Sequence, residues 1–409
     1  MRSRPKTGLL RAPKDGLLRP PKDGLLRPRN GEEAKVTYVE LFFDLIYAFA
    51  VTQLSHKLVH DLSLLGALET LVLWFAVWLG WQYTCWVTNW FDPERIEVRL
   101  LLLAIMLIGM VMAASLPYAY AGRGLIFALS YVGIQLGRSL IVLLLLGRHH
   151  ALSANFRRIC GWLMISGLGW IAGGLSHGTL RFALWTAAVL CEYISPMIGF
   201  ALPVLGRSRS TDWRSAEGGH IAERCQGFVI LALGESVLVT GATLSDSANW
   251  SAPTVISFLV CFTGSCALWW IYFDRGSRAG SRAITESSEP GMMAAYFHYV
   301  HAVLIAGIVA CAAADDLVIE HPDHAIGLTS ALLLLGGPFI YLLGNALYKR
   351  VIYGRIPLSH WIGAALLALI VPFAFRTDLL MVCGLTTLTL MTVAAWESIS
   401  RRRSGAGRH

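Results

Sequence analysis

The sequence predicts an all-α polytopic membrane protein with about twelve transmembrane helices, and three observations lead to this class. Of the 409 residues, 55% are hydrophobic and 15% are charged, whereas soluble domains carry about 25% charged residues. From residue 39 onward, apolar runs long enough to cross about 30 Å of hydrocarbon alternate with short polar breaks. Lysine and arginine concentrate in every second break.

The predicted spans follow one another with little chain between them, so consecutive spans should cross the bilayer in opposite directions. They are 39–58, 67–90, 100–118, 124–146, 158–175, 181–203, 220–243, 252–273, 292–314, 325–347, 358–375 and 378–399.

The distribution of basic residues predicts the orientation. The N-terminal region and the breaks after the second, fourth, sixth, eighth and tenth spans hold most of the lysines and arginines, while the other breaks hold one or none. Because cytoplasmic loops are enriched in these residues, both termini are predicted to be cytoplasmic. The net charge of +8 arises at the two ends of the chain, +6 from residues 1–38 and +4 from residues 401–409, and the core between them is slightly acidic. Nucleic acid is therefore not an expected partner.

Residues 1–37 are predicted to form a disordered basic tail. Gly-Leu-Leu-Arg recurs in it with a period of eight, beginning at residues 8, 16 and 24. Proline and glycine in every copy prevent a continuous helix, and eight residues are too few for a packed repeat unit. The tail is expected either to contact anionic lipid headgroups, at about 1 kcal/mol per basic residue near the surface, or to have no specific role.

The spans divide into two halves of six that resemble one another. Trp90-Phe-Asp closes the second span and Tyr272-Phe-Asp closes the eighth. Six is an even number, so both halves would insert in the same orientation, as parallel repeats do. The predicted organisation is a cytoplasmic tail at 1–37, a first half at 38–203, a cytoplasmic linker at 204–219, a second half at 220–400 and a basic cytoplasmic tail at 401–409.

Ionisable side chains inside a span cost a few kcal/mol each at the helix centre and mark candidate functional sites. Arg138, Glu192 and Glu235 lie near the middle of the fourth, sixth and seventh spans. Three charges at one depth predict an internal cluster in which the arginine neutralises at least one carboxylate. Such a cluster either stabilises the fold or forms a polar pathway between the halves in which a glutamate carries a proton.

Two further spans carry candidate pathway residues. Glu40 and Asp44 stand at i and i+4 in the first span and therefore share a face, and Glu40 could equally compensate the charge of a helix N-terminus. Gln53 lies farther along the same span, about two and a half turns beyond Asp44. His298 and His301, three residues apart, are compatible with proton transfer or with half of a metal site, although a histidine satisfied by neighbouring groups explains each position as well.

Several classes of chemistry are not indicated. The sequence has no GxxxxGK[ST], GxSxG or HExxH motif, and the loops are too short for a soluble catalytic domain. The eight cysteines form no CxxC motif, so neither a disulfide framework nor a zinc site is indicated. No cofactor and no metal are expected.

Two segments resemble a known family. The stretch Glu40-Leu-Phe-Phe-Asp-Leu-Ile-Tyr through His56 resembles the opening signature of the bacterial low temperature requirement A (LtrA) family, and His220-Ile-Ala-Glu-Arg-Cys through Ser236 resembles its second signature. The resemblance implies a multi-pass protein of the bacterial inner (cytoplasmic) membrane without an assigned biochemical activity. The positions that carry the motif are Glu40, Asp44, Gln53, His56, Glu223, Arg224, Gly234 and Glu235.

These observations predict a secondary transporter or permease for an unidentified small solute or ion. Its pathway candidates are Asp44, Gln53, Arg138, Glu192, Glu235, His298 and His301, and proton coupling through the buried carboxylates is part of the hypothesis. The alternative is a membrane-embedded enzyme that acts on a lipid or a lipid-linked substrate, whose polar residues would gather near one face. A third hypothesis is a regulatory or scaffold protein whose buried charges serve packing alone.

Overall fold

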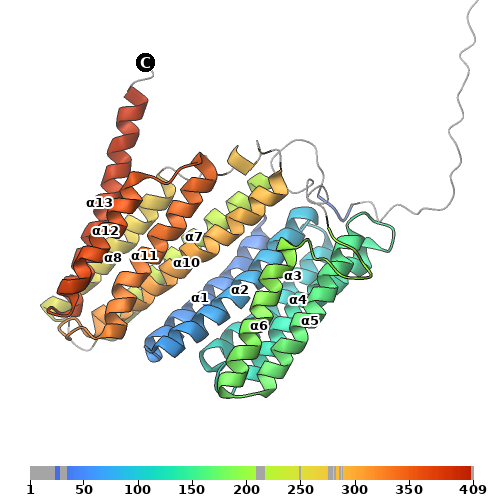
Figure 1. Ribbon diagram of the computed structural model, residues 1–409, viewed down its shortest axis with the longest axis horizontal. Coiled ribbons are helices and arrows are strands. Elements are labelled where there is room, and N and C mark those ends of the chain that lie inside the picture. Colours follow the sequence, from blue (N-terminus) through green and yellow to red (C-terminus); the bar gives the residue numbers. More distant parts are fainter. Residues whose placement is uncertain are drawn as a thin grey trace, which may run out of the picture.

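The computed structural model describes residues 24–27, 35–208, 217–247, 250–274, 280, 282–284, 287 and 289–406, the last six without their side chains. The described residues form long α-helices joined by short turns, with no β-strand among them (Figure 1). The helices are α1 Tyr38–His60, α2 Leu64–Trp90, α3 Ile96–Ser115, α4 Gly124–Leu146, α5 Ser153–Leu175, α6 Gly178–Met197, α7 Gly218–Asp246, α8 Ala252–Phe273, α10 Pro290–Glu320, α11 Leu328–Tyr353, α12 Leu358–Ala374 and α13 Leu379–Ala406, and a short 3₁₀ turn, η1 Leu116–Tyr118, follows α3.

The predicted all-α polytopic class is confirmed. Ten of the described helices are long and apolar enough to cross a membrane, and α12 is a shorter apolar helix. Each of the twelve predicted spans overlaps one of the helices. Large apolar side chains such as Leu107, Leu144 and Leu168 are more than two-thirds exposed, which is the surface expected where helices face lipid instead of water.

Local sequence explains where several helices begin and end. The Ser63 hydroxyl accepts a hydrogen bond from the backbone N of Gly66 at 2.9 Å and caps α2. The Ser251 hydroxyl caps α8 in the same way, with a proline in its first turn. Gly354 has a φ of 70° and ends α11 in the left-handed conformation that glycine adopts without strain.

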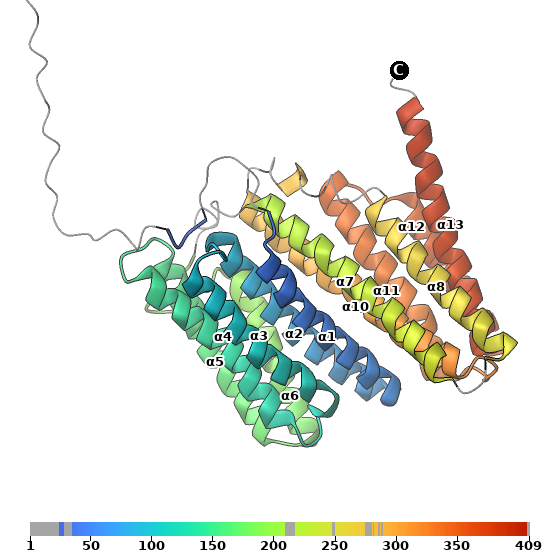
Figure 2. The ribbon, with the colours of Figure 1, turned by 180° about the vertical axis from the view of Figure 1, so that it is seen from behind.

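The helices form two groups side by side. In Figures 1 and 2, α1–α6 lie together on one side and α7–α13 on the other. The two groups meet where α1 and α2 of the first face α7 and α10 of the second. Both α1 and α2 pack against α7 and α10. A continuous core of buried apolar side chains runs through both groups.

Within each group the helices pack in the same order. The first helix of a group, α1 or α7, packs against the second and the third, α2 and α3 or α8 and α10. The third, fourth, fifth and sixth helices then pack in succession in both groups. Two related six-helix units would produce this order, and the parallel repeat itself stays a prediction.

The N-terminal tail departs from its prediction at residues 24–27. Leu25 is buried, and Leu26 pairs with Phe91 in an isolated antiparallel β-bridge just after α2. The backbone N of Arg27 donates to Trp90 O at 2.9 Å, and Asp92 N donates to Leu25 O at 2.9 Å. The prediction of a disordered 1–37 is therefore wrong for this segment, because it gains backbone hydrogen bonds from the end of α2. Residues 1–23 and 28–34 of the tail, and 209–216 of the predicted linker, lie outside the described residues.

Candidate functional site at the interface of the two groups

Glu40 is at the centre of a buried polar cluster at the start of α1. Its side chain is fully buried, and it occupies the third position of the helix. Glu40 Oε2 accepts hydrogen bonds from the backbone N and the hydroxyl of Thr37, both at 2.9 Å. This is the capping role that a glutamate plays at the third position of a helix. Glu40 therefore does cap the N-terminus of α1, as one interpretation of the sequence proposed. The cap involves Oε2 alone, and this oxygen also accepts a hydrogen bond from Arg27.

Two side chains of α7 reach Glu40 from the other group. The other carboxylate oxygen, Oε1, accepts from His220 Nε2 at 2.8 Å and from Arg224 Nη1 at 2.9 Å. His220 Nδ1 lies 3.3 Å from the amide nitrogen of Asn89 at the end of α2. A neutral imidazole that donates through Nε2 and accepts through Nδ1 satisfies both contacts.

Asp44 extends the cluster one turn deeper along α1. Asp44 Oδ1 accepts from Arg224 Nη2 at 2.6 Å and from Trp81 Nε1 at 2.7 Å. Asp44, Arg224 and Trp81 are all at most 1% exposed. Arg224 of the second group thus binds both Glu40 and Asp44, which is possible because the two carboxylates share a face of α1.

Arg27 of the tail supplies the second positive charge. Its Nη2 donates to Glu40 Oε2 at 2.8 Å and lies 3.3 Å from His220 Nε2. Its Nε donates to the carbonyl of Thr88 at 2.7 Å. With Arg27 in place, the two carboxylates face two guanidinium groups, which is the pairing that buried charges require.

Three buried polar atoms of this cluster have no hydrogen-bond partner among the described residues: Asp44 Oδ2, Arg224 Nε and His298 Nε2. All three side chains surround Trp81. The Arg224 guanidinium carbon lies 5.8 Å from the Trp81 ring centre, and the His298 ring lies 5.8 Å from it. Buried polar groups are normally satisfied, so unmet capacity at one place is where a water, proton or ligand would bind.

The two histidines of α10 belong to different surroundings. His298 and His301 each donate through Nδ1 to the carbonyl four residues earlier, at 3.0 and 2.6 Å. His298 contacts the interface cluster, whereas His301 Nε2 accepts from the Tyr272 hydroxyl at 2.7 Å inside the second group. In the part of the chain that the structure describes, they do not converge with a third ligand on one metal position.

The expected cluster of Arg138, Glu192 and Glu235 is not formed. Arg138 donates to Gln135 Oε1 at 2.5 Å and to Thr84 Oγ1 at 3.0 Å, on the side of α4 that faces α2.

Glu192 lies among α4, α5 and α6 instead, where it accepts from Tyr131 at 2.5 Å and from Trp170 at 2.9 Å. Glu235 is half-buried on α7 and accepts from the Thr52 hydroxyl of α1. No ion pair joins the three among the described side chains, so the prediction that the arginine neutralises one of these carboxylates is wrong.

The other motif residues lie outside the interface cluster. Glu223 is exposed, and its carboxylate accepts from the backbone N of Val36 at 3.3 Å. Gln53 is half-buried, and His56 and Gly234 are exposed.

Several members of buried polar sites were not among the pathway candidates predicted from the sequence, although Arg224 was named as a motif position. His220 and Arg224 stand four residues apart on α7, the same spacing as Glu40 and Asp44 on α1, and this matched spacing was the available signal. A second buried ion pair, between Lys349 and Glu397, holds α11 to α13. Its residues sit at the ends of spans, where charges are ordinarily solvated, so the sequence gives no sign of the pair.

Comparison with known proteins gives two similarities. Residues 35–395 match the family described as bacterial low temperature requirement A protein (LtrA). An uncharacterized protein of Rhizobium meliloti (strain 1021) is 38% identical over 386 residues, which cover 92% of this chain and 93% of that protein. No solved structure matches.

Proposed function

The chain belongs to the bacterial low temperature requirement A (LtrA) family, and from that premise we propose that it is a secondary transporter or permease for a small solute or ion. Its site would be the cluster of Glu40, Asp44, His220 and Arg224, in the bacterial inner membrane with both termini in the cytoplasm. The single observation that carries the proposal is the buried Asp44 carboxylate, bound to both groups of helices and with one oxygen free.

The place of the cluster supports this proposal. In transporters built from repeats, substrate and coupling-ion sites lie at the interface between the repeats. Here α1 and α2 meet α7 and α10, and each carboxylate of α1 is held by a side chain of α7. Relative movement of the two groups would have to break these contacts, which couples the protonation or ligand state of the site to the arrangement of the helices.

The charges of the cluster support an ionic ligand. Glu40, Asp44 and Arg224 together carry one net negative charge, and Arg27 balances it in the present arrangement. When Arg27 is elsewhere, a proton or a small cation would restore the balance. A proton on Asp44 Oδ2 is the simplest case and makes proton coupling part of the proposal.

Flux into proteoliposomes tests the function. Purified full-length protein is reconstituted with a pH-sensitive dye inside the vesicles, and gradients of H⁺, Na⁺, K⁺ and guanidinium are imposed in turn. We expect at least one gradient to drive flux well above that of protein-free vesicles and of vesicles with heat-inactivated protein. An equal dye response in all three preparations for every gradient would count against a proton-coupled transporter of small cations.

A membrane-embedded enzyme that acts on lipid is the second candidate, because the cluster forms near one end of the helices. Glu40, His220 and Asn89 lie at the first turns of α1 and α7 and the last turn of α2, close to where a lipid headgroup would be. The lipid composition of a deletion strain grown at low temperature separates the candidates. A lipid composition that changes on deletion, and that a variant with a substituted cluster residue such as His220 fails to restore, would favour the enzyme. An unchanged lipid composition would favour the permease.

A further inference from the structure

The four tail residues that dock beside the cluster are the four that all three copies of the tail repeat share. Gly-Leu-Leu-Arg begins at residues 8, 16 and 24 and is common to all three copies, whereas Pro-Lys-Asp recurs only after the first two. The docked copy is Gly24 to Arg27, and it lies outside the stretch that matches the family, which begins at residue 35.

Each docked residue makes a contact that its side chain or backbone explains. Gly24 has a φ of 121°, a backbone conformation that residues with a Cβ rarely adopt, so this position favours glycine. Leu25 is 7% exposed and joins the apolar core. Leu26 pairs with Phe91 through flanking backbone hydrogen bonds, as a peptide does when it adds to a strand edge.

The Arg27 guanidinium group lies among three hydrogen-bond acceptors from other residues, one for each of its nitrogens. Nε donates to Thr88 O at 2.7 Å, Nη1 to Lys35 O at 3.2 Å and Nη2 to Glu40 Oε2 at 2.8 Å. Arg27 is 9% exposed and Glu40 is fully buried. The planar fork of donors that arginine presents is therefore satisfied on all three nitrogens, which a lysine could not achieve.

We propose that Glu40, the carbonyls of Thr88 and Lys35, and the edge at Phe91 form a binding site for a Gly-Leu-Leu-Arg peptide, and that the three copies in the tail compete for it. The ligand class is a short peptide with a terminal guanidinium side chain, supplied by this chain. This binding does not depend on the proposed function, because its test measures docking and not flux.

Competition among the copies has a calculable size. All copies share the four docking residues, so they differ in the length of chain that tethers them to α1. The copy ending at Arg19 has roughly twice the tether of the copy ending at Arg27, and loop closure then lowers its occupancy only about two- to threefold. The second copy should therefore occupy the site in a measurable fraction of molecules.

Engineered disulfides in the full-length protein test the proposal. Leu26 and Phe91 form a pair whose flanking residues carry the hydrogen bonds, so their Cα atoms are expected about 4.5 Å apart, within the range of about 4.4–6.8 Å that a disulfide needs. The variants are Leu26→Cys, Leu18→Cys or Pro21→Cys, each with Phe91→Cys, and peptide mapping after brief mild oxidation gives the rate of each cross-link.

We expect the cross-link from position 26 to form fastest and the one from 18 to follow within about fivefold. Position 21 is nearer along the chain but is not a docking residue, so its cross-link should be at least tenfold slower than that from 18. Arg27→Ala should raise the rate from 18 about two- to threefold, and Arg19→Ala should lower it about 10- to 100-fold, the factor for one charge-assisted hydrogen bond. A faster cross-link from 21 than from 18, or rates indifferent to both arginines, would overturn the proposal.

Thiol labelling provides a measurement that leaves Phe91 unchanged. In the full-length protein, Leu25→Cys should be protected from a membrane-impermeant maleimide because Leu25 is buried. Adding Glu40→Gln should increase its labelling at least tenfold, whereas the matched change of the exposed Glu223→Gln should leave it protected. Equal labelling of Leu25→Cys in all three backgrounds would contradict docking through Glu40.

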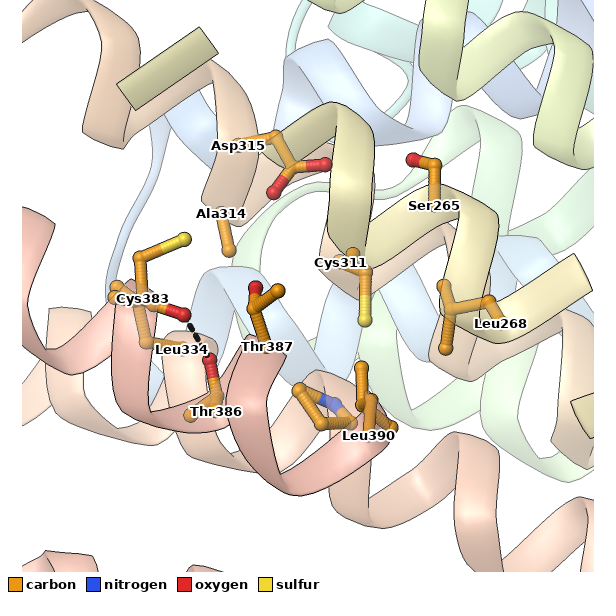
Figure 3. A pocket seen from close by; sticks show the side chains of 12 residues that line it. Ser265, Leu268, Cys311, Ala314, Asp315, Leu334, Cys383, Thr386, Thr387 and Leu390 are labelled. Carbon is orange, nitrogen blue, oxygen red and sulfur yellow. Dashed lines mark hydrogen bonds between the residues drawn. The ribbon is translucent and has the colours of Figure 1, made fainter. Parts of the chain in front are cut away.

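A separate observation carries a second proposal, in the second group of helices. Cys261 of α8, Asp315 of α10 and Cys383 of α13 place one ligand atom each within 4.8 Å of the others. Asp315 and Cys383 line a cavity of about 30 Å³, which Figure 3 shows with Ser265 and Cys311 in its wall. That volume accommodates about one water molecule or ion.

The two thiols are spaced as zinc ligands are. Their sulfurs lie 3.8 Å apart, and two sulfurs at about 2.3 Å from a tetrahedral zinc ion are separated by about 3.8 Å. Two thiolates and a carboxylate would supply three of the four ligands of a tetrahedral ion, which leaves one position for a water molecule. Two exposed acidic residues, Glu320 at the end of α10 and Asp323 in the turn that follows it, would attract cations to this end of the molecule.

We infer that Cys261, Asp315 and Cys383 bind a thiophilic divalent cation of the Zn²⁺ and Cd²⁺ class. Reduced full-length protein is titrated with Cd²⁺, and the sulfur-to-metal charge-transfer absorption is recorded. One equivalent should produce the absorption. Cys261→Ser and Cys383→Ser should each reduce it by at least half, Asp315→Asn should weaken binding about tenfold, and Cys266→Ser, an exposed cysteine of the same helix, should change nothing. Absent absorption, or absorption unaffected by the first two variants, would overturn the inference.

Discussion

Arg224 is the side chain whose removal should disturb this structure most. It holds Glu40 at 2.9 Å and Asp44 at 2.6 Å, and all three side chains are at most 1% exposed. Arg224→Met keeps most of the apolar stem and removes the charge. Asp44 then retains only the Trp81 N–H as a donor among the described residues.

Breaking a buried ion pair from one side costs about 3–5 kcal/mol because an uncompensated charge stays buried. We therefore expect Arg224→Met to lower the free energy of unfolding by about that amount. The matched control is Arg99→Met, which removes an ion pair with Glu94 of similar length, 2.8 Å, but with both partners exposed. Exposed pairs contribute about 0–1 kcal/mol, so the control should stay within about 1 kcal/mol of the unaltered protein.

Denaturant unfolding in detergent, followed by tryptophan fluorescence, measures both free energies by linear extrapolation. Adding Asp44→Asn to Arg224→Met removes the uncompensated buried charge. The double variant should therefore lose about 0.5–3 kcal/mol less unfolding free energy than the sum of the two single losses, the coupling typical of residues in contact. A loss of unfolding free energy in Arg224→Met no larger than that in Arg99→Met would show that Arg224 does not neutralise buried charges. Full additivity of the free-energy losses of Arg224→Met and Asp44→Asn in the double variant would contradict a direct interaction between the two side chains.

Two more predictions concern how helices are held together. Asn89→Ala removes both hydrogen bonds between its side-chain amide and the backbone of Glu217, at 2.8 and 2.9 Å, and should cost about 1–3 kcal/mol in the same unfolding measurement; an unchanged midpoint would show that α2 and α7 are joined without it. Gly307→Leu puts a side chain where a Cβ would lie 2.4 Å from Tyr341 N, so overpacking should cost about 1–3 kcal/mol. Gly133→Leu, whose Cβ meets nothing within 4 Å, is its control, and equal losses in the two variants would disprove close packing of α10 on α11.

The sequence predicted relations within a helix better than relations between helices. Glu40 and Asp44 share a face because the helical repeat determines how positions four apart are oriented. The same rule would have linked His220 to Arg224. That the two pairs meet depends on how α1 and α7 are rotated toward each other, and a single sequence does not determine this rotation.

Depth in the membrane was a misleading criterion for the central charges. Arg138, Glu192 and Glu235 lie at similar positions along their spans, but their side chains point toward different neighbours. Neutral side chains provide the hydrogen bonds, Gln135 for Arg138 and Tyr131 for Glu192. These buried charges are therefore satisfied without an ion pair between them.

The docked tail segment could not be predicted for a different reason. Proline and glycine exclude a helix, but they do not exclude an extended segment of four residues whose partners lie elsewhere in the chain. The partner of Leu26 is Phe91, and the partner of Arg27 is Glu40. Neither contact leaves a periodic pattern in the sequence.

The central claim is that the interface cluster performs the transport and does not only hold the fold together. The most direct test is the flux of Asp44→Asn protein in proteoliposomes, compared with Glu223→Gln protein at equal amounts of folded protein. We predict that Asp44→Asn lowers the flux about tenfold or more while Glu223→Gln leaves it unchanged, because Asp44, unlike the exposed Glu223, presents a buried, unpartnered carboxylate oxygen. Equal flux from the two folded variants would contradict the account.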